Sequence, residues 1–477
     1  MFVAREGTFP DKSKQTISRL ICLPLEILEQ IVKHVHHISV IENKGIHGLW
    51  SQRKSQLAFV PIDKRSQRYI MQLDNRVPIL NSLQSLSVVN RCLHDLCCRL
   101  LWETLRFPTR LPIPITLWIN ELLPKHGFRI RSLSLTLSTR FLKTPHNDPF
   151  RHNIHYDNTA LRKEGVCRKH LESCNCFVRE MLSPKSVMGL LDQCHGNLSD
   201  LDIIFSAELE NRLENLNSRM HGLQLFFARL TPVMSRLSGL RHLGLRNIHF
   251  ASFNDEVLSQ MFSGLSLLES FSASDLPTWF VDHNKHPNHT GEPLSRLKNL
   301  LRLQFHQVSA VDESYCHHSW PKVITELHLE GCSNVNPTVG HQLIHRIAPN
   351  LTRLRLDFCN SVEDFDFGSN WQEKLQFQLP HLTDLNIQPY EHDYLTCFQE
   401  CQNLQRLKCD LVAKGQWKYI SHLVCVSTWP KLDKIDLYGL DIYESDDQLL
   451  DDDGIDYHQD LIREFCDQAG IVNCVWI

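Results

Sequence analysis

The sequence lacks a long, uncharged apolar run. No stretch of its 477 residues reaches the roughly 18 to 20 apolar residues that are needed to cross a bilayer. The first residues, MFVAREGTFPDKSK, also lack the apolar core of a signal peptide. We therefore expect a protein that has no membrane partner and works in the cytoplasm and/or the nucleus.

The sequence also lacks a strong charge of one sign, because 50 Lys and Arg residues are balanced by 54 Asp and Glu residues. A formal net charge of −4 gives no general attraction to nucleic acid. One basic segment, at about 38–76, could contact nucleic acid or acidic lipid by neutralising phosphates. A solvated loop is the simpler interpretation of this segment, so no nucleic-acid partner is expected.

Motifs of known catalytic sites are missing as well. The chain has no phosphate-binding glycine loop, no Gly-x-Ser-x-Gly turn and no His-Glu-x-x-His helix. We expect a non-catalytic protein without a cofactor. An enzyme stays open as an alternative only through one cluster of metal-binding residue types, which is described next.

The cluster lies in CRKHLESCNC, and thiolates with imidazole are the ligands that zinc prefers. Its spacing fits no usual zinc finger, and chance clustering is expected among 17 Cys and 27 His residues, so we assign no metal. The odd number of cysteines, without a framework, is typical of free thiols in a reducing compartment. The cluster and the nearby residues of the same types are Cys167, His170, Cys174, Cys176, Cys194 and His195.

A repeat is the strongest positive signal. The segments ITELHLEGC (324–332) and LTRLRLDFC (351–359) both place apolar residues at their first, fourth, sixth and ninth positions. This spacing is typical of a leucine-rich repeat, in which a short strand directs two leucines inward. The ninth residues, Cys332 and Cys359, are expected to be small buried side chains that act as weak hydrogen-bond donors.

Further copies of the repeat recur every 22 to 32 residues, which leaves room for a strand, a turn and a helix in each. The intervening segments NDEVLSQMFSGL, TVGHQLIHRIAP and WKYISHLVCV have helical spacing of apolar residues. We predict an α/β leucine-rich-repeat solenoid with concave strands and convex helices. The further copies begin at Leu240, Leu268, Leu300, Leu382, Leu404 and Leu432, and weaker ones begin at Ile130 and Leu198.

A different pattern precedes the repeats. LPLEILEQIV, from Leu23, and LQSLSVVNRCLHDLCCRLLWETLRF, which ends at Phe107, both have the periodicity of amphipathic helices. Together they resemble an α-helical F-box of fungal type, with a Leu-Pro-x-Glu-Ile opening and a Leu-Trp pair near the end. This F-box departs from the usual pattern through an insertion of about forty residues. The chain as a whole resembles F-box/leucine-rich-repeat proteins.

We therefore predict five regions. They are a flexible N-terminus (1–20), an F-box (21–110) with a basic insertion at about 38–76, a solenoid (111–440) with an irregular insertion at about 138–180, an acidic loop (441–457) and a C-terminal cap (458–477).

The resemblance implies a function: proteins of this type are substrate receptors of SCF-type ubiquitin ligases. The F-box would bind the Skp adaptor subunit, and through it a cullin scaffold, while the repeats would hold a protein substrate for ubiquitination. A scaffold that acts outside a ligase is the alternative. The residues predicted to bind the Skp subunit are Leu23, Pro24, Leu25, Ile27, Leu28, Ile31, Leu86, Val89 and Leu93.

Strand alternation predicts the substrate surface, because residues between inward leucines point to the opposite face of a strand. This face is polar and mixed in sign. Its basic residues would permit phosphate binding unless neighbouring acids already occupy them. The predicted substrate-binding residues are Arg302, Gln304, His306, Glu326, His328, Glu330, Arg353, Arg355, Asp357, Asn386, Arg406, Lys408 and Asp410, with Asp384 and Gln388 on the same face.

Overall fold

A computed structural model describes most of the predicted helices and strands. The chain forms two compact units, Met1–Leu105 and Arg106–Ile477, and each is described by itself below. The described residues are 23–39, 82–107, 115–138, 182, 184–206, 216–248, 255–274, 291–358, 375–388, 394–411, 414–439 and 453–476.

The N-terminal unit contains three described helices, at 25–39, α4 (Ser82–Ser87) and α5 (Arg91–Glu103). The first helix begins after Pro24, whose carbonyl accepts hydrogen bonds from the amides of Ile27 and Leu28 at 3.0 and 3.1 Å. Helix α5 begins at an Asn90 cap, where the Asn90 side chain accepts from the amide of Leu93 at 2.9 Å. The predicted basic insertion, apart from its first two residues, lies outside the described residues.

The second unit is built on one long sheet whose strand order follows the sequence. Consecutive strands from β2 to β12 pair in parallel, as expected for a repeat solenoid. The strands are β1 (Thr104–Phe107), β2 (Ser132–Ser138), β3 (Asp200–Ser206), β4 (His242–Arg246), β5 (Ser270–Ser274), β6 (Arg302–His306), β7 (Glu326–Glu330), β8 (Arg353–Asp357), β9 (Asp384–Gln388), β10 (Arg406–Leu411), β11 (Lys434–Gly439) and β12 (Val472–Trp476).

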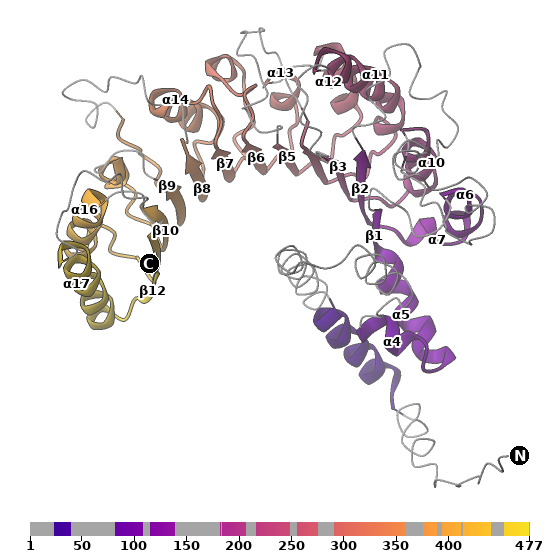
Figure 1. Cartoon of the computed structure of the whole chain (residues 1–477), viewed down its shortest axis with the longest axis horizontal. Coiled ribbons are helices and arrows are strands. Elements are labelled where there is room, and N and C mark those ends of the chain that lie inside the picture. Colours follow the sequence, from indigo (N-terminus) through magenta and orange to yellow (C-terminus); the bar gives the residue numbers. More distant parts are fainter. Residues whose placement is uncertain are drawn as a thin grey trace, which may run out of the picture. The chain divides into compact units, whose positions relative to one another are not determined.

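The described helices of this unit cover one side of the sheet, while its other side forms the inner face of an arc (Figure 1). The predicted helical segments are confirmed in α12, α14 and α16. The helical elements of this unit are α6 (Ile115–Leu117), η1 (Trp118–Leu122), α7 (Leu123–His126), η2 (Gly127–Arg129), α10 (Pro184–Cys194), α11 (Leu216–Met234), α12 (Asp255–Ser263), α13 (Gly291–Ser295), η7 (Glu313–His317), α14 (Pro337–Ile347), η8 (Tyr394–Phe398), α16 (Lys414–Cys425) and α17 (Asp453–Ala469).

The repeat leucines form the core of the second unit. Leu327 and Leu329 of β7 are at most 1% exposed, and they lie in register with Leu354 and Leu356 of β8. The strand residues between them are half-buried or exposed. Burial of alternate residues in the same register explains why one strand motif can be stacked many times.

Side-chain hydrogen bonds join neighbouring repeats next to the strands. The amides of Asn299, Asn350 and Asn403 donate to backbone carbonyls of the preceding repeat at 2.8, 2.9 and 2.5 Å. Cys332 is 2% exposed and its thiol donates weakly to the Phe305 carbonyl at 3.8 Å, in agreement with the expected structural role. Cys359 lies outside the described residues.

The C-terminal end continues the sheet. Strand β12 pairs in parallel with β11, and helix α17 precedes it. The helix begins at Asp453, so the last residues of the segment 441–457, which we predicted as an acidic loop, are helical. The helical spacing of apolar residues in the predicted cap continues into this segment. None of the described helices is long and apolar enough to span a membrane.

Candidate functional site

The N-terminal unit has a small apolar core. Leu28, Val32, Leu83, Leu93 and Cys97 are each at most 3% exposed and form one cluster. Two of the residues predicted to bind the Skp subunit, Leu28 and Leu93, therefore stabilise the unit itself. The structure removes both from the predicted binding surface, because a fully buried side chain is not accessible to a partner.

Other predicted binding residues of this unit are on its surface. Leu25 is 54% exposed, Ile27 is 40% exposed and Val89 is 43% exposed. Ile27 and Ile31 recur with Ile38 at four and seven residues, so they follow one line along the first helix, about 100° around the axis from the core residues. We call Leu25, Ile27 and Val89 the exposed apolar set; Ile31, the fourth residue of this group, is half-buried.

The remaining predicted residues of the unit are intermediate cases. Leu23 and Leu86 are half-buried and pack against the core cluster. Pro24 is exposed. Val88, which the sequence analysis missed, is 72% exposed. It lies in the turn after α4, outside the helical periodicity that was used to select residues.

In the second unit, the predicted substrate residues lie on the strand face opposite the leucines. The parallel register arranges the side chains of β6 to β11 in rows that cross the strands. Row 1 is Arg302, Glu326, Arg353, Asp384, Arg406 and Lys434; row 2 is Gln304, His328, Arg355, Asn386, Lys408 and Asp436; row 3 is His306, Glu330, Asp357, Gln388, Asp410 and Tyr438.

Row 1 alternates in charge. Glu326 lies 3.8 Å from Arg302 and 3.9 Å from Arg353, and Asp384 lies 3.9 Å from Arg353 and 3.6 Å from Arg406. Each carboxylate is thus shared by two guanidinium groups. The three arginine side chains are 48 to 61% exposed, so these pairs contribute little stability in water.

A tighter group joins rows 2 and 3. Glu330 forms an ion pair with Arg355 at 2.9 Å and lies 3.4 Å from His306. The hydrogen bond to Glu330 raises the pKa of the His306 imidazole. Burial alone would raise the pKa of Glu330, but His306 and Arg355 lower it overall. Burial lowers the pKa of His328, which is 3.2 Å from Glu326.

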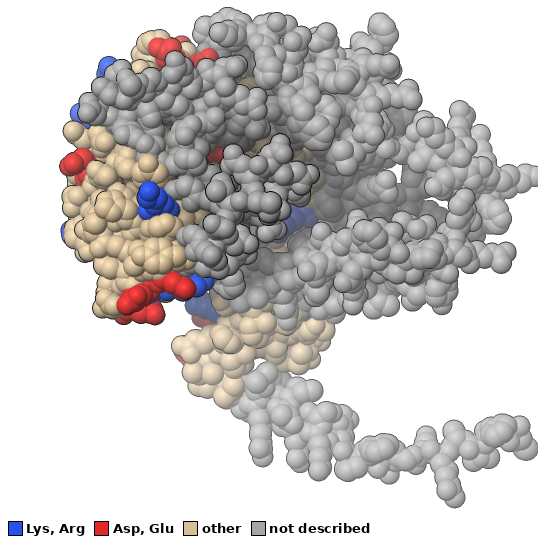
Figure 2. Space-filling view, turned by 60° about the vertical axis from the view of Figure 1, so that its left-hand side comes forward, with Lys and Arg blue, Asp and Glu red and all other residues tan. Residues whose placement is uncertain are grey.

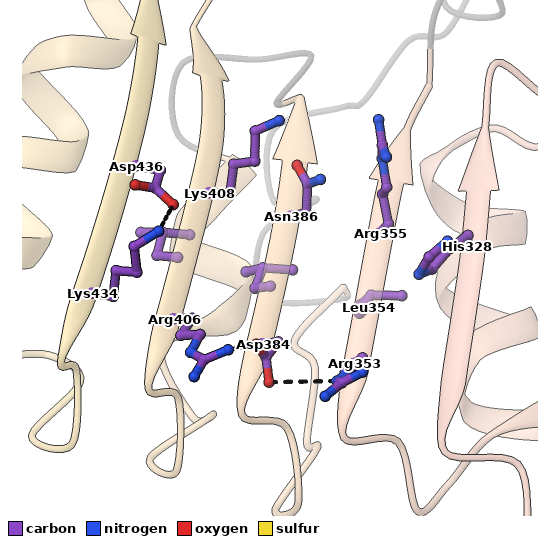
Figure 3. A pocket seen from close by; sticks show the side chains of 12 residues that line it. His328, Arg353, Leu354, Arg355, Asp384, Asn386, Arg406, Lys408, Lys434 and Asp436 are labelled. Atoms are coloured by element: carbon purple, nitrogen blue, oxygen red, sulfur yellow. Dashed lines mark hydrogen bonds and ion pairs between the residues drawn. The ribbon is translucent and has the colours of Figure 1, made fainter. Parts of the chain in front are cut away.

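A hollow of about 340 Å³ lies over β8 to β11 on this face, with His328 of β7 at its margin. Figure 3 shows its polar side chains on neighbouring strands, with Arg353 directed to Asp384 and Lys434 to Asp436. Between these polar residues the strand positions Leu354, Leu385 and Leu407, whose side chains are buried, also line the hollow. The hollow is lined by His328, Arg353, Leu354, Arg355, Asp384, Leu385, Asn386, Arg406, Leu407, Lys408, Lys434 and Asp436.

The sequence analysis missed Lys434 and Asp436, although both line the hollow. Applying the same alternation rule to KIDLYG would have found them, because Ile435 and Leu437 are the buried residues of β11. Strand β5 has no charged residue in these rows. Its residues in register with rows 1, 2 and 3 are the serines Ser270, Ser272 and Ser274.

Figure 2 shows how charged side chains are distributed on one face of the described residues. On the face seen in Figure 2, basic and acidic residues occur in small separate groups among uncharged residues. The hollow brings one of these local groups of charges together.

The possible metal ligands Cys167, His170, Cys174 and Cys176 lie outside the described residues. Cys194 is 1% exposed, and burial raises the pKa of its thiol to about 12, so it stays protonated at neutral pH. Among the described residues no group of three or more His, Cys, Asp or Glu side chains is arranged to hold a metal ion.

Comparison with known proteins adds little. No protein-family model matches the chain, and no curated protein matches it. A solved structure described as "Crystal structure of Rad7 and Elc1 complex in yeast" is similar over 90% of this chain and 97% of that chain, with 14% sequence identity and a TM-score of 0.29. A TM-score this low supports no inference about function. The chain itself shows a repeat-like solenoid with a long parallel sheet.

Proposed function

We propose that this protein is the substrate-recognition adaptor subunit of an SCF-type cullin-RING ubiquitin ligase. The N-terminal unit binds the Skp subunit, which connects it to the cullin, and the strand face of the second unit binds a protein substrate. The protein catalyses no covalent step. It raises the local concentration of substrate lysines near a conjugating enzyme that other subunits supply, which leads to proteasomal degradation. It works in the cytoplasm and/or the nucleus.

The exposed apolar set is the observation that supports this proposal most directly. Leu25, Ile27 and Val89 are 40 to 54% exposed on a unit whose core is already filled by other side chains. Leu25 and Ile27 lie on the first helix and Val89 lies in the turn after α4. Exposed apolar residues next to an independent core are suited to bind a partner in a fixed orientation. The F-box resemblance of the same segment identifies the Skp subunit as that partner.

The test is binding of the purified full-length chain to a recombinant Skp subunit. In a double variant, Leu25→Ala with Ile27→Ala, two exposed anchors are removed while the core cluster is kept. Truncation of an apolar anchor typically costs about 2 kcal/mol, so we expect the affinity to fall more than tenfold. Val323→Ala is the matched control, because Val323 is 44% exposed and lies in the second unit.

Equal affinity of the double variant and the wild type, with an unchanged circular dichroism spectrum, would refute the proposed interface. The alternative of a scaffold that acts outside a ligase makes a different prediction. In that case the Skp subunit co-purifies with the chain and the cullin does not. Mass spectrometry of the purified native complex separates the two functions.

A further inference from the structure

The hollow over β8 to β11 has an excess of positive charge. Five cationic side chains line it, and only two carboxylates do. Because all of them are mounted on hydrogen-bonded strands, their spacing is set by the sheet and changes little on binding. The cationic residues are Arg353, Arg355, Arg406, Lys408 and Lys434, and the carboxylates are those of Asp384 and Asp436.

Local acids satisfy the cations only in part. Lys434 is paired with Asp436 at 2.6 Å, and Arg355 is paired with Glu330 at 2.9 Å. Asp384 lies between two arginines, at 3.6 Å from Arg406 and 3.9 Å from Arg353, and Arg353 also lies 3.9 Å from Glu326. These distances are longer than those of good charge-assisted hydrogen bonds, which are about 2.7 to 2.9 Å. Both guanidinium groups therefore keep donors for a ligand.

Lys408 is the least satisfied cation in the hollow. Its ammonium lies 4.9 Å from the centre of the Tyr438 ring, and no carboxylate of the described residues forms an ion pair with it. Asn386 is on the next strand, in register with both Lys408 and Arg355. Its side-chain amide forms no hydrogen bond to the described residues. Figure 3 shows Lys408, Asn386 and Arg355 side by side.

We propose that this hollow binds a phosphoryl group, with Lys408, Asn386 and Arg355 of row 2 as its direct ligands and Arg406 as a supporting cation. A phosphoryl group has a charge of about −1.5 to −2 at neutral pH and three acceptor oxygens. It offsets most of the charge excess of three that lines the hollow. A carboxylate, with one charge and two oxygens, would leave most of the excess uncompensated.

The distribution of acids determines where on the face the group is bound. Rows 1 and 2 contain the cations that line the hollow, whereas row 3 contains Glu330, Asp357 and Asp410 and no Lys or Arg. Row 3 lies about 7 Å further along the strands, which is two residues of extended chain. Its acids repel an anion, so the ligand is held over row 2 and not at the C-terminal ends of the strands.

The source of the phosphoryl group follows from the proposed function, on which this step depends. The hollow is open and lies on the strand face that would bind a protein substrate, so the ligand is a phosphorylated side chain of that protein. Binding would then require prior phosphorylation of the substrate by a kinase. A small phosphorylated molecule has the same chemistry, and the experiment below distinguishes the two sources.

The test uses the purified full-length chain without other subunits. Fluorescence anisotropy compares three fluorescent pools of random peptides, with a central phosphoserine, aspartate or serine. We expect the phosphoserine pool to bind and the serine pool not to bind, and we expect inorganic phosphate to compete. Lys408→Gln and Arg355→Gln should each weaken binding about tenfold, because each removes a charged hydrogen-bond donor to the phosphoryl oxygens.

The matched control is Arg246→Gln. Arg246 belongs to β4, outside the hollow, and pairs with Asp202 at the same 2.9 Å as Arg355 with Glu330. An equal loss of binding in this control would mean that diffuse charge is responsible, and it would overturn the site. Equal binding of the phosphoserine and serine pools would overturn it too. Binding of inorganic phosphate without binding of the phosphoserine pool would overturn the peptide source.

Failure of this inference is distinguishable from failure of the proposed function. Lys408→Gln leaves the N-terminal unit unchanged and should bind the Skp subunit with wild-type affinity. If the wild-type chain binds the Skp subunit but no phosphoserine pool, only the phosphoryl site is wrong. If it binds the phosphoserine pool but no Skp subunit, only the ligase assignment is wrong.

Discussion

Gly264 provides a sharp test of how closely neighbouring repeats pack. It follows α12, and a Cβ atom placed on it would lie 2.5 Å from the Cα and 2.7 Å from the carbonyl carbon of Ser235, which follows α11, and closer still to the carbonyl oxygen of Ser235. Real Cβ atoms essentially never come closer than 3.0 Å to other heavy atoms. All three obstructing atoms are backbone, so no rotation of a side chain relieves the overlap.

We therefore expect Gly264→Ala to force α11 and α12 apart by at least the missing 0.5 Å. Overpacking of this kind typically lowers the free energy of unfolding by about 1 to 3 kcal/mol. In a unit of this size that corresponds to a Tm lowered by roughly 1 to 4 °C. In a solenoid the loss falls on the interface between two repeats, so hydrogen exchange should speed up most in α11, α12 and β5.

Gly196→Ala is the control, since no atom lies within 4 Å of a Cβ at that position and Gly196 is also in a turn after a helix. Alanine there restricts the unfolded chain and should be neutral or stabilising by about 0.4 to 1 kcal/mol. Thermal melts followed by circular dichroism compare the two variants. If the Tm of Gly264→Ala is equal to or higher than the Tm of Gly196→Ala, the two repeats do not pack as closely at Gly264 as the structure shows.

Two other predictions concern single side chains. The hydrogen bond to Glu330 raises the folded-state pKa of His306, so the stabilising contact is fully present below the unfolded-state pKa of histidine and is lost as the pH rises through the folded-state value. An NMR titration of the imidazole should show a His306 pKa above that of free histidine and a lower one in Glu330→Gln; an unchanged pKa in that variant would contradict the assignment. Asn90→Ala should destabilise the N-terminal unit by about 1 kcal/mol, because the Asn90 side chain accepts from the Leu93 amide at the start of α5. Hydrogen exchange in α5 measures this loss, and Asn90→Asp, which keeps the acceptor, should exchange almost as slowly as the wild type.

Much of the second unit could be predicted from local patterns. A strand of the LHLEG type alternates its side chains, so Leu327 and Leu329 had to lie opposite His328 whatever their neighbours were. The spacing of 22 to 32 residues between copies predicted a stacked array, and the structure confirms a parallel sheet in sequence order. The beginning of the C-terminal cap was predicted too late, at 458, whereas helix α17 begins at Asp453. Helix ends are hard to predict because they depend on weak local preferences among charged residues.

The sequence by itself thus determined which residues face outward along each strand and that the strands stack, since both depend on spacing within one repeat. Only the tertiary structure decided which apolar residues of the N-terminal unit are core, because Leu28 and Ile27 are neighbours whose burial depends on the packing of α4 and α5. It also decided which charges are shared. Asp384 lies between Arg353 and Arg406, and Lys408 has no acidic partner among the described residues, because register joins side chains that are 22 to 31 residues apart in the chain.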